Sequence, residues 1–379
     1  MADRETEILA RIAPGVAAID AAQWDSLTDG GDPFLSHAFL AALEESGSVG
    51  PGTGWSSAPI LVEEDGKLLA AAPAWLKSHS QGEYVFDHGW ADAFERAGGS
   101  YYPKLQIAVP FTPVAGRRLL AREPAFASAL IATAERIVDS NGLSSAHATF
   151  IASEEVALFE RAGWLIRTDS QFHWFNDGYG SFEDFLAALS SRKRKTIRKE
   201  RSLALEGLKV RQLTGSDITE AHWDAFWGFY QDTGARKWGH PYLTRAFFSQ
   251  LGERLADRVL LIFALRGDQP IAGALNLIGE QALYGRYWGA LAEVPYLHFE
   301  LCYYQAIEAA IERGLARVEA GAQGSHKLAR GYRPTPTWSA HYLPDPAFRE
   351  AVSRFLMGER RAVQREIEEL DSFTPFRKV

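Results

Sequence analysis

The pattern of apolar and polar positions predicts two similar β-hairpins far apart in the chain. In each, two apolar runs flank a short turn, Asp65-Gly66 within residues 60–70 and Gly267-Asp268 within residues 261–273. Asp and Gly tolerate the positive φ angles that tight hairpin turns require. Both segments are therefore expected to form antiparallel strand pairs.

Each predicted hairpin is followed, further along the chain, by a helix that ends at a glycine and then by a strand. We expect a helix over about 124–140 before Gly142, and a second over about 298–313 before Gly314. The strands that follow are expected over 146–151 and 316–320. Segments 159–164 and 327–332 also match, each a short helix ended by glycine and an aromatic residue. This common order predicts two copies of one α/β unit.

The two predicted copies differ in one place, an additional segment in the first copy at about residues 75–104. Insertions of this size on a compact unit are often functional loops. A turn-rich stretch over 176–180 separates the copies. The expected domains are therefore residues 1–178, which carry the inserted loop, and residues 179–379, which begin with a basic helix.

That basic helix is expected to start after Ser181 and to carry an apolar stripe of Phe182, Phe185, Leu186 and Leu189. Continuing the same helix places charged residues, Lys193 among them, on the apolar side. Either the helix end extends beyond the core into solvent, or this face lines a cleft between the domains. Seven Lys or Arg residues lie between positions 192 and 201. Such a run is either a solvated face or a phosphate-binding surface.

Overall composition excludes several classes of protein. The net charge of −8 argues against binding to DNA through bulk charge, and no apolar run approaches the roughly 18 residues of a membrane span. The single cysteine, Cys302, excludes a disulfide framework and is expected to pack in the core. No histidine pair has metal-ligand spacing, so no metal is expected. The acidic N-terminus lacks a signal-peptide pattern. We expect a cytoplasmic protein, with peripheral contact at the inner membrane left open.

Four segments, 87–106, 110–116, 191–200 and 321–335, carry a family resemblance together with the repeated unit. They resemble the FemAB-like N-acyltransferases, in which two GNAT acyltransferase domains follow one another. The resemblance implies a mixed α/β tandem GNAT-like fold and transfer of an acyl group from an activated donor to an amine. We expect the site in the cleft between the domains, mostly on the second.

One stretch departs from the GNAT pattern. GNAT enzymes that use acetyl-CoA usually hold its pyrophosphate on a glycine-rich loop at the start of the long helix. The corresponding residues 288–298 do not match that loop. The donor is therefore left open among acyl-CoA, an acyl carrier protein and aminoacyl-tRNA. No permanently bound cofactor is expected, and the thioester acts as a co-substrate.

Catalytic residues are expected in the second copy. GNAT enzymes often place an acidic tyrosine five residues before the aromatic residue of the glycine–aromatic step. Phe159, which donates no proton, occupies this position in the first copy, whereas Lys327 preceded by His326 occupies it in the second. Glu300, in the first turn of the long helix, is the leading candidate for general base. A carboxylate favoured there by the helix dipole is the alternative interpretation.

The candidate substrate-binding residues come from four places, and ordinary packing or solvation explains each of them equally well. The inserted segment contributes His88, Trp90, Tyr101, Tyr102 and Lys104, and the basic helix contributes Lys193, Arg194 and Arg198. An aromatic and basic loop contributes Lys237, Trp238 and Tyr242. The end of the second copy contributes Glu319, Arg330 and Arg333.

The resulting prediction is an N-acyltransferase that acts on a small-molecule or lipid amine and binds no DNA. Three alternatives stay open. One is an aminoacyl-tRNA-dependent aminoacyltransferase of the peptidoglycan type, which the basic helix favours. Another is a lipid-directed enzyme for a long-chain, sphingoid-type amine, which the 12% aromatic content fits. The last is a non-catalytic binding protein on the same fold. The oligomeric state is also left open.

Overall fold

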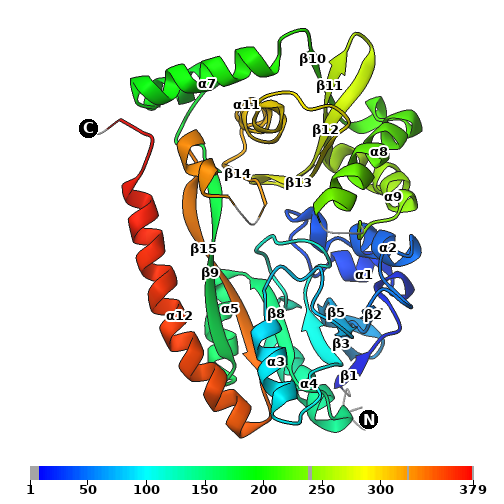
Figure 1. Cartoon of the computed structure of the whole chain (residues 1–379). Helices are drawn as coiled ribbons and strands as arrows, with labels where there is room; N and C mark the ends of the chain where they lie inside the picture. The colour runs from blue at the N-terminus through cyan, green and yellow to red at the C-terminus, as the bar shows by residue number, and fades with distance from the viewer. Residues whose placement is uncertain (1–7, 238–240, 322–323, 378–379) are drawn as a thin grey trace. The chain divides into compact units, whose positions relative to one another are not determined.

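The computed structural model describes residues 8–237, 241–321 and 324–377. The chain divides into two compact units (Figure 1). Unit 1 comprises Met1–Asp169 and Pro336–Gln364, and unit 2 comprises Ser170–Thr335 and Arg365–Val379. Two strands cross this division: β9 (Leu165–Phe175) begins in unit 1, and β15 (Arg333–Tyr342) begins in unit 2. The expected domain limit at residues 178 and 179 stays a prediction.

Unit 1 contains most of the N-terminal half of the chain. Its strands are β1 (Ile8–Ile12), β2 (Trp55–Ser57), β3 (Ile60–Glu64), β4 (Lys67–Ala72), β5 (Ala74–Lys77), β6 (Lys104–Ile107), β7 (Leu120–Ala121) and β8 (Ala146–Ile151). Its helices are η1 (Val16–Ala18), α1 (Ala21–Asp25), η2 (Pro33–Leu35), α2 (His37–Glu45), α3 (His88–Arg96), α4 (Pro124–Asn141) and α5 (Ser153–Arg161). The long α12 (Pro346–Ser372) begins in this unit.

Two sheets form in unit 1. One has the order β1-β3-β4-β7, and in the other β15 is followed by β8-β6-β5-β2. The predicted first hairpin is confirmed: β3 and β4 pair around Asp65 and Gly66, which have φ angles of 50° and 77°. Pro59 and Pro73 separate β2 from β3 and β4 from β5, because proline offers no N–H to a ladder. The hairpin therefore joins a different sheet from β2 and β5.

The helix and strand predicted after the first hairpin are also confirmed. Helix α4 runs over Pro124–Asn141 and ends at Gly142, whose φ of 61° is the left-handed conformation of a helix C-cap. Strand β8 runs over Ala146–Ile151 and pairs in parallel with β6. The face of these strands that carries Leu105, Ile107 and Ala148 packs on α4 in a buried apolar core.

Unit 2 contains the second repeat. Its strands are β10 (Lys209–Leu213), β11 (Val259–Arg266), β12 (Gln269–Ile278), β13 (Ala282–Ala290) and β14 (Arg317–Glu319). Its helices are α6 (Phe182–Ala188), α7 (Ser191–Ala204), η3 (Gly215–Asp217), α8 (Glu220–Lys237), α9 (Arg245–Leu255), η4 (Ala256–Arg258), α10 (Leu297–Phe299), the π-helical η5 (Glu300–Tyr304), α11 (Gln305–Glu312) and η6 (Ser325–Arg330).

The sheet of unit 2 has the order β10-β11-β12-β13-β14-β9, and only its β13–β14 pair is parallel. Helices α8 and α9 lie side by side on one face (Figure 1). Gly289 of β13 allows the close approach of α8, since a Cβ there would lie 2.1 Å from the carbonyl oxygen of Phe229. The opposite face packs on α11 through Leu283, Val318 and Ile307.

The basic helix differs from its prediction. The chain leaves the helical conformation at Leu189 and Ser190, whose ψ angles are 156° and 148°, so α6 and α7 are separate helices. The continuous apolar stripe from Phe182 into the basic run was therefore wrong. Leu189 instead forms an isolated antiparallel β-bridge with Phe376 near the C-terminus. The buried residues of α7 are Ile197 and Ala204.

Among the residues that the structure describes, no helix is both long enough and apolar enough to cross a lipid bilayer.

Candidate active site

The candidate site of unit 2 lies where the two parallel strands of its sheet separate. The β13–β14 ladder ends at the pair Tyr284–Glu319, and β13 continues for six more residues to Ala290. On its other edge, Gly285 and Tyr287 pair with Asn276 and Leu275, which leaves Arg286 as an extra residue, a β-bulge. Bulges of this kind often lie beside active sites, where they redirect side chains.

A pocket of about 100 Å³ lies at this separation. The strands contribute Asn276 and residues 285–288, the end of β14 contributes Ala320 and Gly321, and the helical segment contributes His298, Cys302 and Tyr303. Cys302 and Tyr303 belong to the π-helical turn Glu300–Tyr304, a rare widening of a helix that is frequent at functional sites. A β-bulge and a π-turn thus face one another across one pocket.

Tyr303 supplies the pocket with a hydroxyl that is tied to a histidine. Its hydroxyl oxygen lies 2.9 Å from Nε2 of His326, and its side chain is buried. Burial raises the pKa of Tyr303, and burial together with Arg330 and Lys327 lowers the pKa of His326. At neutral pH the pair therefore consists of a protonated phenol beside a neutral imidazole, which is an arrangement able to donate a proton.

Lys327 holds the loop at the end of β14. Its buried ammonium donates a hydrogen bond of 2.8 Å to the carbonyl oxygen of Gly321, which lines the pocket. Burial lowers the pKa of Lys327 to about 8. Burying a charge costs free energy unless the charge is hydrogen-bonded. Losing the hydrogen bond to Gly321 would therefore be unfavourable, and the bond holds Gly321 in place.

Glu319 places a carboxylate on the face of the sheet opposite α11, one residue before Ala320, which lines the pocket. Val318 faces α11, so Glu319, its neighbour on the strand, faces the opposite side. Arg317 Nε donates to Glu319 Oε1 at 2.8 Å, and His173 Nε2 lies 3.7 Å from Oε2. Within the described part of the chain, Oε2 is buried and has no hydrogen-bond partner. A buried carboxylate oxygen that accepts no hydrogen bond indicates a place for a donor from outside the chain.

A larger pocket of about 590 Å³ shares Trp288 and His298 with the first. It lies along the connection from β13 to α10, where residues 290–295 and Leu297 form its wall. Its described lining residues include no Lys or Arg and one carboxylate, Glu293. The N–H of Leu297 already donates to the carbonyl of Val294. This is the connection whose sequence departs from the GNAT pyrophosphate loop.

Glu300 lies in an ion-pair network beneath the π-turn. Its side chain is 0% exposed and accepts hydrogen bonds from Arg201 at 2.9 Å and from Gln305 at 2.8 Å. Arg201 also binds Glu308 at 2.8 Å. The pocket lining does not include Glu300. Its role as general base stays a prediction, beside a structural role that these contacts define.

A second network joins α7 to η6. Glu200 accepts two hydrogen bonds of 2.9 Å from Arg330 and one from the Tyr304 hydroxyl. The Arg330 guanidinium also lies 3.5 Å from the centre of the Phe299 ring, a cation–π contact. Both ends of the π-turn are therefore attached to the basic helix.

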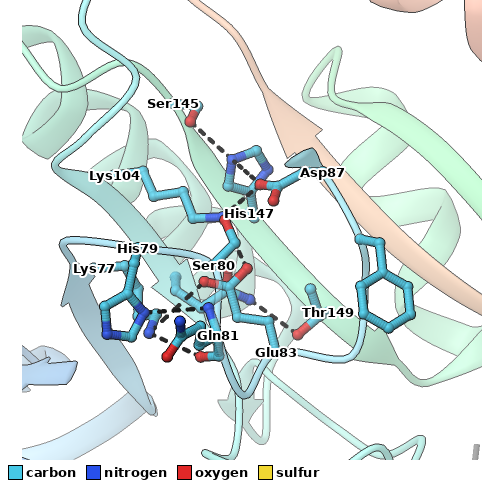
Figure 2. Close-up of polar contacts among 12 residues, drawn as sticks. Lys77, His79, Ser80, Gln81, Glu83, Asp87, Lys104, Ser145, His147 and Thr149 are labelled. Carbon is cyan, nitrogen blue, oxygen red and sulfur yellow. Dashed lines mark hydrogen bonds and ion pairs between the residues drawn. The ribbon is translucent and has the colours of Figure 1, made fainter. Parts of the chain in front are cut away.

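Unit 1 contains a buried cluster of charged residues on the face of β6 and β8 opposite α4 (Figure 2). Lys104 Nζ donates to Ser80 at 2.8 Å, to Glu83 at 2.8 Å and to Asp87 at 2.5 Å. Tyr101 donates to the same Asp87 oxygen at 2.7 Å. The inserted segment that was predicted from the sequence supplies most of these groups, so it closes over the polar face of the sheet.

Histidines continue this cluster. His147 Nε2 lies 2.8 Å from the Ser145 hydroxyl, and His147 Nδ1 lies 2.7 Å from Nδ1 of His341. Burial lowers the pKa of His147 to about 3, and that of His341 is also lowered. Both rings are therefore neutral. The edge of Trp90 packs on His341 at a ring distance of 4.9 Å.

The charges of the cluster perturb one another. Burial raises the pKa of Glu83 to about 7 and lowers that of Lys77, 3.9 Å away, to about 7. Burial alone would raise the pKa of Asp87, but Lys104 outweighs it and holds that pKa well below its usual range. Burial also opposes the charge of Lys104, and the two carboxylates raise its pKa in spite of that.

The sequence profile of the FemAB-like family, described as peptidoglycan biosynthesis/recognition, matches residues 15–378. The chain belongs to the FemAB-like family. Its mixed α/β fold is shared with the structure of FemX. None of the curated proteins matches it significantly.

Three solved structures show how widely this fold is shared. FemX is 12% identical with a TM-score of 0.55, and the match covers 92% of this chain and 100% of that one. The C-terminal domain of a putative lysylphosphatidylglycerol synthetase from Agrobacterium fabrum is 11% identical with a TM-score of 0.55, covering 90% and 97%. L-PGS from Bacillus licheniformis is 12% identical with a TM-score of 0.51, covering 86% and 98%. Identities this low establish the fold alone.

The FemAB-like chain brings some of the sequence-predicted residues together and keeps others apart. His326 contacts Tyr303 and Lys327 contacts Gly321, and both contacted residues line the small pocket of unit 2. Glu319 immediately precedes the lining residue Ala320. Tyr101, Tyr102 and Lys104 belong instead to the unit 1 cluster. His88 is exposed, and Trp90 packs against His341.

The remaining candidates have contacts of their own. Arg198 pairs with Glu183, both exposed, and Arg333 pairs with Asp177. Lys193 and Arg194 are half-buried on α7. The N–H of Tyr242 donates to the hydroxyl of Tyr230, Lys237 ends α8, and Trp238 lies outside the described residues.

Sequence reasoning missed Tyr303, Asn276 and the Lys77–Glu83 pair. Tyr303 lies in an apolar helical run, where an aromatic residue normally indicates core packing. The one available signal was its spacing from His298, five residues earlier on the same helix. The π-turn that turns it toward His326 has no signature in the apolar pattern.

Proposed function

We propose that this FemAB-like protein is an N-acyltransferase that moves an acyl group from a thioester to a primary amine at the separation of β13 and β14. The observation that carries the proposal is the pocket between the β-bulge and the π-turn, with Tyr303, which contacts His326, in its wall. In the reaction, the amine nitrogen bonds to the thioester carbonyl carbon, the C–S bond breaks, and an amide and a thiol form.

Glu319 is proposed to bind the amine and to remove its proton. Its buried Oε2, which accepts no hydrogen bond from the described residues, provides an acceptor for an ammonium group, and it lies on the face of the sheet opposite α11. The thioester would enter from the α11 side, where the pocket opens beside Cys302 and Tyr303. The two substrates would then meet through the space that β14 leaves when it ends.

Tyr303 is proposed to give a proton to the departing thiolate, with His326 holding the phenol in place. The contact of 2.9 Å between the two side chains supports this role. Lys327 keeps Gly321 in the pocket wall and is a positioning residue. General acids and bases typically contribute about 10²- to 10⁴-fold to a rate.

The test is an amide-forming assay followed by mass spectrometry. The purified chain is incubated with acyl-CoA esters of increasing length and with a panel of primary amines. Tyr303→Phe and Glu319→Gln should each lower kcat at least about 100-fold in any reaction that is found. Tyr304→Phe is the matched control, because Tyr304 is in the same π-turn but bonds to Glu200 outside the pocket. Wild-type kcat in Tyr303→Phe and Glu319→Gln would refute these assignments.

A further inference from the structure

We propose that the outward face of α7 is a docking surface for an acidic acyl carrier protein, which delivers the thioester to the pocket of unit 2. This inference rests on the proposed acyl transfer and names its donor class. The surface consists of Arg192, Lys195 and Lys199, which are all exposed. They follow one another at helical spacings of three and four residues, so they form one stripe.

The stripe lies opposite the side of α7 that packs on unit 2. Ile197 is 1% exposed, and the helix turns about 100° per residue, which places Lys195 and Lys199 on the far side from it. Other charged residues of α7 are already paired: Arg198 with Glu183, Glu200 with Arg330, and Arg201 with Glu300. Across the described residues, no acidic side chain pairs with Arg192, Lys195 or Lys199.

The helix that carries this stripe is attached to the pocket wall. Arg201 binds Glu300 at the start of the π-turn, and Glu200 binds Tyr304 at its end. Cys302 and Tyr303, between these two anchors, line the pocket. A carrier protein bound on the outward face of α7 is proposed to extend its flexible phosphopantetheine arm past this helix to the pocket whose wall the helix anchors.

The larger pocket favours a carrier-bound donor over free coenzyme A. The phosphates of coenzyme A need cationic side chains or free backbone N–H groups. Among the described lining residues of that pocket there is no Lys or Arg, and Glu293 would repel a phosphate. A carrier protein presents a phosphopantetheine arm whose single phosphodiester lies at the carrier end, without the adenosine phosphates of coenzyme A, and is recognised through its own acidic surface.

The same charges favour a carrier protein over RNA. Nucleic-acid-binding surfaces are usually broad basic faces on a basic domain. Here the stripe is one helix long, on a chain whose net charge is −8. A short basic stripe on an acidic protein fits a small acidic partner, for which charge complementarity supplies orientation and on-rate.

The test measures binding and transfer separately. Fluorescently labelled bacterial acyl carrier protein carrying a palmitoyl thioester is titrated with the full chain at low salt and at 0.5 M NaCl. The triple variant Arg192→Glu, Lys195→Glu and Lys199→Glu should raise Kd at least about ten-fold, and added salt should do the same because exposed charges are screened. The matched control reverses three exposed arginines of α12, Arg354, Arg361 and Arg365, and should leave Kd unchanged.

Transfer assays with palmitoyl-CoA and palmitoyl-carrier protein then separate this inference from the proposed function. The triple variant should lose kcat/KM for the carrier-bound donor at least about ten-fold and keep it for palmitoyl-CoA. Equal loss with both donors, no carrier binding, or tighter binding of bulk tRNA or of anionic phosphatidylglycerol vesicles would overturn the docking proposal. Amide formation from palmitoyl-CoA without carrier binding would leave the proposed acyl transfer standing. Carrier binding without amide formation from either donor would instead refute the transfer.

Discussion

Replacing Glu300 by glutamine separates its two interpretations, general base and structural ion pair. The carboxylate is fully buried and accepts three hydrogen bonds from Arg201, at 2.9, 3.1 and 3.2 Å, besides one from Gln305. Glutamine has nearly the same shape but carries no charge, and its amide N–H groups would face those of Arg201. The substitution therefore removes the charge while it keeps the packing.

The expected loss of stability follows from this geometry. Breaking a buried ion pair by removing one partner costs about 3–5 kcal/mol. Arg201 is 19% exposed and keeps Glu308 at 2.8 Å, so the lower end, about 3 kcal/mol, applies. In a domain of this size each kcal/mol shifts Tm by about 2–4 °C, so Tm of the transition that reports on unit 2 should fall by about 6–12 °C.

Urea unfolding and thermal unfolding of wild type, Glu300→Gln, Arg201→Gln and the double variant measure this loss. If the pair is structural, the double variant should be less destabilised than the sum of the single variants, because each single variant leaves one charge of the pair without its partner and the double variant removes both. Assays of acyl transfer below the transition should show nearly normal kcat. Unchanged stability together with a kcat lowered at least about 100-fold would refute the structural interpretation and make Glu300 the base.

Three further predictions concern unit 1. Phe159→Ala should lower the free energy of unfolding by about 3–5 kcal/mol and leave kcat unaltered, because the ring is 0% exposed and packs on Trp164. Equilibrium unfolding measures the loss of stability, and a lower kcat without such a loss would contradict the prediction. Lys104→Met should lower the free energy of unfolding by about 3–5 kcal/mol, because Glu83 and Asp87 then stay buried without the cation that binds both. Adding Glu83→Gln and Asp87→Asn should recover part of that loss in urea unfolding, and no recovery would argue against the buried network. The pKa of Glu83 is raised to about 7 in the folded protein, so between about pH 4.5 and 7 folding requires this carboxyl to stay protonated. The free energy of unfolding of the wild type relative to Glu83→Gln should therefore be greatest below about pH 4.5 and decline toward pH 7, by at most about 1.4 kcal/mol per pH unit. A difference that does not change with pH across this window would show that Glu83 keeps an ordinary pKa.

The periodic parts of the fold were predictable because they depend on local signals. The turn at Asp65-Gly66 and the C-cap at Gly142 each require a backbone conformation that few residues adopt, and β3, β4 and α4 end where those signals lie. The two short helices that end in glycine and an aromatic residue also share a backbone hydrogen bond. The N–H of Trp164 donates to the carbonyl of Phe159, and that of Tyr332 donates to the carbonyl of Lys327.

The site was less predictable because its geometry depends on tertiary contacts. The break between α6 and α7 places Leu189 in contact with Phe376, nearly 190 residues away, and no helical pattern encodes such a contact. Glu300 was found as a charge that interrupts an apolar helix face. Its partner, Arg201, was hidden in a run of basic residues that all look alike in sequence, although the structure pairs only some of them.

The repeated fold also explains why chemistry is proposed in only one unit. Equivalent rows of side chains cross the three strands next to each parallel pair: Gln106, His147 and His341 in unit 1, and Tyr284, Glu319 and His173 in unit 2. In unit 1 the central residue of the row is a neutral histidine, bonded to Ser145 and His341 beneath the inserted segment. In unit 2 the central residue is a carboxylate, one oxygen of which accepts no hydrogen bond from the described residues. A row whose polar groups are all hydrogen-bonded within the protein stabilises its unit, whereas a row with a polar atom that lacks a hydrogen bond leaves that atom for a substrate to bind. The corresponding position of the repeated unit is therefore part of a hydrogen-bonded network in the first copy and is proposed to be available to a substrate in the second.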